Sequence, residues 1–95
     1  MVKVVDEQQA ESGGREYFFW CPGCRCYHWF RTDSAVKPNW TWNGDYEKPT
    51  VSPSIHVMPG SPTNCHLFIK DGQIQFLMDS YHDLKGQTVD MESVD

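Results

Sequence analysis

Residues 65–78 read CHLFIKDGQIQFLM and predict a β-hairpin. Asp71-Gly72 is typical of a two-residue turn between antiparallel strands, in which the turn positions need positive φ angles. Pairing Lys70 with Gln73 places alternate side chains on opposite faces of the resulting hairpin. One face, which we expect in the core, carries Cys65, Leu67, Ile69, Ile74, Phe76 and Met78. The other face carries His66, Phe68, Gln73, Gln75 and Leu77.

Two further hairpins are predicted upstream. The aromatic run 17–20 and the segment 26–30 have high β propensity and flank Cys21-Pro22-Gly23-Cys24, so this knuckle is predicted to join two antiparallel strands. Asn43-Gly44 follows the alternating segment 39–42 and predicts a two-residue type I′ turn. Trp40 and Trp42 fall on one face of that segment, which favours the core.

The remaining segments add short elements to a mainly β chain. We expect an edge strand at 2–5, a loop at 58–64, one helical turn at 81–85 capped by Asp79 or Ser80, and a last strand at 87–91. No segment has a sustained helical period. The prediction is one mainly β domain over 1–95, either a small zinc-ribbon-like antiparallel sheet or a compact β-sandwich. Residues 1–16 form its edge strand and polar loop, 17–91 its core and 92–95 a tail.

Composition excludes several classes of function. The chain has 13 Asp and Glu against 8 Lys and Arg, a formal net charge of -5, and its basic residues are scattered. It therefore lacks the clustered positive charge of a nucleic-acid binder. No run is long and apolar enough for a membrane span, and the first residues do not resemble a secretion signal. We expect a cytoplasmic protein, in the host cytosol if it is phage-encoded.

The cysteines and histidines predict a zinc site. A chain of 95 residues buries little apolar surface, so an additional cross-link is expected. Cys21 and Cys24 have the spacing of a zinc knuckle and supply two thiolates. We expect Cys65 and His28 to complete the site, with His66 or His82 as the alternative fourth ligand. Cys65 and His66 are neighbours on a strand and point to opposite faces, so they are not expected to bind the same ion.

The same residues allow other interpretations. Trp20-Cys21-Pro22-Gly23-Cys24 superficially resembles a thiol redox motif, but no βαβ pattern surrounds it. Cys26 is expected to be a core or partly exposed thiol. The chain has no Gly-rich phosphate loop, Ser-centred elbow or paired-His helix, which argues against an enzyme. Asp79 is then expected to cap the helical turn, Asp83 to be solvated, and His82 to bond a backbone carbonyl.

Several blocks of the sequence, taken in order, resemble a known family. They are FWCPGC with His28, WTWNGD at 40–45, PTVSPSI at 49–55, CHLF at 65–68, DGQIQFL at 71–77 and HDLKGQTV at 82–89. They are similar to a family of small uncharacterised proteins found mainly in bacteriophages and prophages, some of which are labelled ammonia monooxygenase. The resemblance spans about residues 17–91 and implies a functional set of Cys21, Cys24, His28, Cys65, His66 and His82. Cys26 and His56 do not match the family pattern.

Three hypotheses of function follow. The first is a zinc-stabilised phage or prophage protein that binds a host or phage protein. The second is a small zinc-dependent hydrolase or nucleic-acid-processing enzyme that uses His66 and His82 around an open zinc position. The third is a thiol redox protein.

Overall fold

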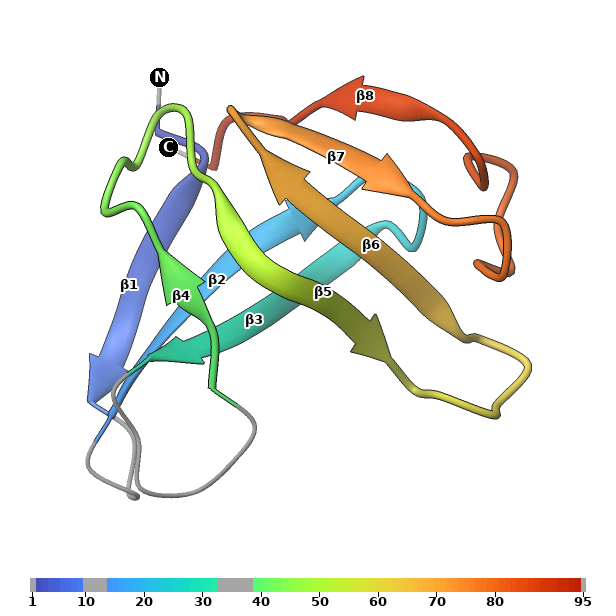
Figure 1. Ribbon diagram of the computed structural model, residues 1–95, viewed down its shortest axis with the longest axis horizontal. Coiled ribbons are helices and arrows are strands. Elements are labelled where there is room, and N and C mark those ends of the chain that lie inside the picture. Colours follow the sequence, from blue (N-terminus) through green and yellow to red (C-terminus); the bar gives the residue numbers. More distant parts are fainter. Residues whose placement is uncertain (1, 10–13, 33–38, 95) are drawn as a thin grey trace.

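The computed structural model describes residues 2–9, 14–32 and 39–94, and it consists of two antiparallel sheets (Figure 1). The first sheet has the order β1-β2-β3 and comprises β1 (Val4–Gln9), β2 (Arg15–Cys21) and β3 (Cys26–Thr32). The second has the order β4-β5-β6-β7-β8 and comprises β4 (Thr41–Trp42), β5 (Val51–Val57), β6 (Cys65–Lys70), β7 (Gln73–Phe76) and β8 (Thr88–Asp90). The mainly β fold class is confirmed.

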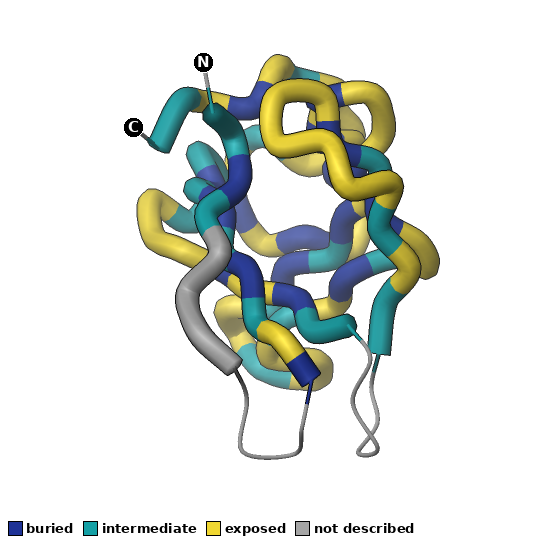
Figure 2. The backbone as a smooth tube through the Cα atoms, turned by 90° about the vertical axis from the view of Figure 1, so that its left-hand side faces the viewer, coloured by how far each residue is buried: buried dark blue, intermediate teal, exposed yellow. Residues whose placement is uncertain are grey.

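The core lies between the two sheets. Phe19 and Phe30 from the first sheet and Leu67, Ile74 and Phe76 from the second belong to one cluster of fully or almost fully buried side chains. Figure 2 shows that buried positions recur along the chain between half-buried and exposed ones. No helix among the described residues is long and apolar enough to cross a membrane.

The hairpin of β6 and β7 has the predicted register, with Lys70 opposite Gln73 and Ile69 opposite Ile74. Five of the six residues expected in the core are buried. Met78 is instead 72% exposed, because β7 ends at Phe76 and the chain turns away from the sheet. The knuckle also joins β2 to β3 as predicted, with Cys21 opposite Cys26.

Two local predictions were wrong. Trp42 pairs with Val51, so residues 43–50 form a long connection rather than a two-residue turn at Asn43-Gly44. The Asn43 side chain stabilises this connection, because its Oδ1 accepts hydrogen bonds from the amides of Asp45 and Thr50. The predicted helical turn at 81–85 is a series of tight turns, and no described residue is helical.

Strand β5 is irregular around Ser54. Its register against β6 shifts between Val51 and Ile55. β4 pairs with β5 only at Ser52 and Val51. The backbone at Ser54 is held from the other side, because the Trp40 indole N–H donates to the Ser54 carbonyl at 3.2 Å.

Candidate active site and metal centre

Four side chains converge at one end of the sandwich. The ligand atoms of Cys21, Cys24, Cys65 and His82 all lie within 4.8 Å of one another. Cys65 Sγ and His82 Nε2 are 3.4 Å apart. A sulfur at about 2.3 Å and a nitrogen at about 2.0 Å from a tetrahedral ion would be about 3.5 Å apart. The four side chains, called the metal group from here on, therefore have the spacing needed to hold one metal ion.

The four ligands come from both sheets. Cys21 ends β2 and Cys24 lies in the knuckle, whereas Cys65 begins β6 and His82 follows β7. The His82 imidazole lies directly against Gly23, where an added Cβ would be 2.2 to 2.5 Å from its ring atoms. Only glycine at position 23 lets the ring approach the knuckle this closely. An ion at this site would join the two sheets.

The three thiols cannot all ionise together without a cation. The Cys65 thiol donates to Cys21 and, with His28, lowers the pKa of Cys21 to about 4 against the effect of burial. Burial, and next the Cys21 thiolate, raise the pKa of Cys24 to about 11. The hydrogen bond to Cys21 is the main cause that raises the pKa of Cys65. Negative charge at Cys21 thus keeps protons on its neighbours, and a bound cation would remove that conflict.

The structure places His82, one of the two alternatives, beside the three cysteines, and His28 outside this group. His28, on β3, lies opposite Phe19 of β2. This pair is two residues along the strands from the pair of Cys21 and Cys26. It interacts with Cys21, and its buried Nε2 has no hydrogen-bond partner within the described part of the chain. Cys26 is exposed and also lies outside the group.

A second polar cluster lies on β5, β6 and the segment after β7. Ser54 Oγ is 2.9 Å from His66 Nε2, and His66 Nδ1 is 3.1 Å from Asp79 Oδ2. A nucleophile, a base and an orienting carboxylate at these distances form the constellation of a Ser-His-Asp catalytic triad. The hydrogen bond from His66 holds the pKa of the Asp79 carboxyl below its usual range. Asp79 is therefore charged at neutral pH, as an orienting carboxylate must be.

The backbone around Asp79 is fixed to the start of β6. The Ser80 hydroxyl donates to the His66 carbonyl at 2.9 Å and accepts from the His66 amide at 3.1 Å. The Leu77 amide donates to the same carbonyl, and Asn64 Nδ2 donates to the Asp79 carbonyl at 2.6 Å. These bonds place the carboxylate next to the imidazole, so Asp79 does not cap a helix as expected.

His56 completes the polar face of this cluster. It lies opposite His66 in the β5 and β6 pair, and the two rings stack with centroids 4.3 Å apart and an interplanar angle of 13°. Its Nε2 also bonds Asn64 Oδ1. The stacked ring covers one face of His66 and limits how far this imidazole can rotate.

The fold places residues that are neighbours in the sequence in two different clusters. Cys65 belongs to the metal group and its neighbour His66 to the triad, as expected for opposite faces of a strand. His66 and His82 also fall in different groups. Ser54 lies in the block PTVSPSI at 49–55, but no catalytic motif such as a Ser-centred elbow surrounds it, so no local pattern identified it as a nucleophile.

Comparison with known proteins adds a family. No curated protein and no solved structure matches the chain. A family model described as "Bacterial ubiquitination-like system serine protease (BubE)" matches residues 2–77, well over half of the 95 residues. The match includes Ser54, His66 and the three cysteines of the metal group, and it stops two residues before Asp79. The chain belongs to the BubE family.

Proposed function

We propose that the protein is a serine protease of a bacterial ubiquitination-like system. The observation that carries this proposal is the continuous chain of contacts from Ser54 Oγ through His66 to the Asp79 carboxylate. The family description names the same chemistry and supports the proposal independently. The chain order Ser54, His66, Asp79 is no obstacle, because the same constellation occurs in different chain orders on unrelated folds.

The geometry assigns a role to each group. Ser54 Oγ attacks the carbonyl carbon of the peptide bond while His66 Nε2 accepts its proton. His66 then returns this proton to the leaving amine, and an acyl ester remains on Ser54. Water, activated by His66, hydrolyses the ester and regenerates the serine. Asp79 keeps the His66 ring in the tautomer with its proton on Nδ1 and stabilises the imidazolium that forms.

We also propose that the ion of the metal group is Zn²⁺ and that its role is structural. Three thiolates and one imidazole are a common ligand set of structural zinc sites. Four protein ligands leave no open position for water, so the ion would have no direct part in hydrolysis. This arrangement does not favour a hydrolase with His66 and His82 around one open zinc, because the two residues lie in separate clusters.

The site also bears on the redox and the binding-partner hypotheses. Cys21 and Cys24 have a third thiol and an imidazole beside them, which favours metal binding over thiol redox chemistry. A binding partner from the host or a phage, and the phage or prophage origin itself, stay predictions. A protein that binds its substrate and cleaves it would satisfy both the interaction hypothesis and the catalytic one.

The test is the replacement of the nucleophile. Ser54→Ala removes the attacking oxygen, so we expect peptide hydrolysis to fall about a thousandfold or more, with an unchanged melting temperature. Ser52→Ala is the matched control, because Ser52 is an exposed serine on the same strand outside the triad. Cleavage of a peptide mixture is measured by mass spectrometry. A Ser54→Ala variant that cleaves as fast as the Ser52→Ala variant would exclude the proposed nucleophile.

A further inference from the structure

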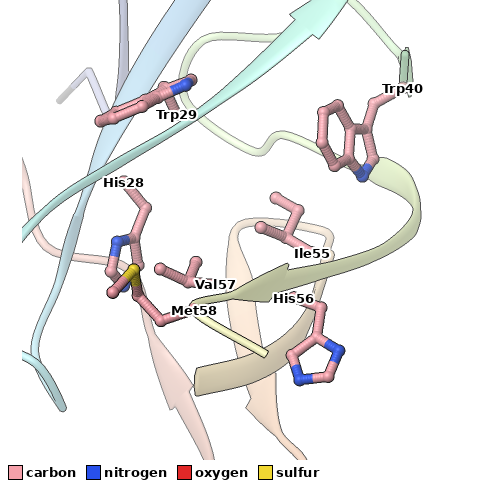
Figure 3. A pocket seen from close by; sticks show the side chains of 7 residues that line it. All are labelled: His28, Trp29, Trp40, Ile55, His56, Val57 and Met58. Atoms are coloured by element: carbon pink, nitrogen blue, oxygen red, sulfur yellow. The ribbon is translucent and has the colours of Figure 1, made fainter. Parts of the chain in front are cut away.

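An apolar pocket lies beside the triad. It has a volume of about 270 Å³ and is lined by His28, Trp29, Trp40, Ile55, His56, Val57 and Met58 (Figure 3). Ile55 and Val57 extend from β5 towards the strand that carries His28 and Trp29, whereas His56 extends from the other side of β5. The pocket thus opens between the two sheets, along the strand that carries Ser54.

Two contacts join this pocket to the catalytic residues. Trp40, one wall, donates its indole N–H to the Ser54 carbonyl. His56, another wall, stacks on His66. The Ile55 side chain lines the pocket from the opposite face of β5 to His56. A peptide with its carbonyl at Ser54 would therefore reach the pocket past Trp40 and His56.

The lining selects the chemistry of the occupant. None of the seven lining residues is Asp, Glu, Lys or Arg, so a charged side chain would lose its hydration without gaining an ionic partner. An apolar cavity of about 150 Å³ is large enough for benzene, so 270 Å³ accommodates one large side chain. Trp29 and Met58 at its rim are 61% and 59% exposed, which leaves apolar surface in water that a substrate would cover.

We infer that this pocket is the specificity subsite of the protease and binds a bulky apolar side chain, aromatic or branched aliphatic, within two residues of the cleaved bond. The inference rests on the proposed function of Ser54 and names the substrate class of the same site. Trp40 is then also a positioning residue, because it contacts both the pocket and the backbone of the nucleophile. The residues that line the pocket, and not the triad, then determine which substrate side chain is preferred.

The experiment maps cleavage sites in a peptide mixture by mass spectrometry, with wild type, Trp29→Ala and Phe68→Ala. Wild type should enrich aromatic or branched aliphatic residues at one position within two residues of the cleaved bond. Trp29→Ala should lower that enrichment about tenfold, since one pocket contact discriminates by roughly this factor. Phe68, which is 40% exposed on β6 outside the pocket, serves as the control and should keep the wild-type pattern. Met58→Ala replaces Trp29→Ala if that variant does not fold.

Labelling of wild-type Ser54 by a small fluorophosphonate separates the two claims. If Ser54 is not labelled and no peptide is cleaved, the proposed function fails. If Ser54 is labelled and peptides are cleaved without an apolar preference, the subsite is wrong and the nucleophile stands. The inference is also overturned if the pocket variant shows the same enrichment as wild type.

Discussion

In the proposed triad, Asp79 orients His66 for its role as a base. Its carboxylate lies 3.1 Å from His66 Nδ1 and is half exposed to solvent. This exposure means that water screens part of its charge, so its main contribution is the orientation and tautomer of the ring. The carboxylate should therefore matter for turnover more than for folding.

Replacing Asp79 tests that role. Asp79→Asn keeps the shape of the side chain but removes the negative charge that selects the tautomer, so we expect kcat to fall by up to about ten-thousandfold with little change in melting temperature. Asp83→Asn, another exposed acid in the same segment, should leave kcat unchanged. Steady-state kinetics on one cleaved peptide measures both variants. Equal kcat values in the two variants would remove Asp79 from the triad.

Gly23 is the residue on which the position of His82 depends. In Gly23→Ala the new methyl group would lie within 2.5 Å of the His82 ring, so the ring must move away from the three sulfur atoms. We expect weaker zinc binding by about tenfold or more in a chelator competition titration. Gly60→Ala is the control, because its φ of +79° makes alanine strained there while no atom lies within 4 Å of the added Cβ. Equal zinc affinity in both variants would contradict the placement of His82.

Zinc binding should release thiol protons. In the metal-free protein the pKa of Cys21 is lowered to about 4, so this thiol is already ionised at neutral pH. The raised pKa of Cys24, about 11, and that of Cys65 keep these two thiols protonated. Both must lose a proton to bind the ion, so affinity rises with pH by about a hundredfold per unit near neutrality. Calorimetry in buffers of different ionisation enthalpy should show release of about two thiol protons, and release of none would contradict the assignment.

At the scale of elements, the metal group and the triad are built from the same two segments. Cys65 and His66 are successive residues at the start of β6, and Asp79 precedes His82 by three residues in the segment after β7. Two hydrogen bonds join these segments. Asn64 Nδ2 donates to the Asp79 carbonyl, and the Ser80 hydroxyl donates to the His66 carbonyl. A structural ion would therefore fix the base and its carboxylate without touching the substrate.

The β6 and β7 hairpin could be predicted because its information is local. Alternation of apolar residues and the Asp71-Gly72 turn define both the register and the buried face. The prediction failed only at Met78, where the sequence continues the alternation but β7 ends. Asn43-Gly44 failed for the opposite reason, since the Asn43 side chain bonds to Thr50 and stabilises a longer connection.

The site could be predicted only in part. The cysteines indicated three of the four metal-group residues. Cys21 and Cys24 have the spacing of a zinc knuckle, which supplies only two ligands, and Cys65 offers a third thiolate. The choice of His82 over His28 depends on how the segment after β7 folds against Gly23, which no local pattern encodes. Ser54, His66 and Asp79 are separated by 12 and 13 residues, and the irregular pairing of β5 with β6 brings them together.

For the whole molecule, the proposed zinc ion would add to the stability that the small core supplies. The two sheets share one small cluster of buried side chains, and Cys21 and Cys65, both fully buried, belong to it. Structural zinc contributes roughly 10 kcal/mol or more to small domains. The ion would then stabilise the sandwich where β2 meets β6.

Metal removal should affect stability and catalysis together. A strong chelator should lower the melting temperature by at least about 10 °C, because about 1 kcal/mol corresponds to several degrees in a domain of this size. Hydrolysis should fall in parallel, since His66 and Asp79 lose their support, and added Zn²⁺ should restore both. Calorimetry and peptide cleavage on the same sample provide the two readings. Unchanged melting and unchanged cleavage after verified metal loss would refute the structural role.

The proposed mechanism requires Ser54 to be an activated nucleophile. The most direct measurement is reaction of the protein with a small fluorophosphonate, followed by mass spectrometry of the modified peptide. The structure predicts one adduct on Ser54 in wild type, at a rate that falls strongly in His66→Ala, and no adduct in Ser54→Ala. Modification of another residue at the wild-type rate, or a rate at Ser54 that is unaffected by His66→Ala, would contradict it.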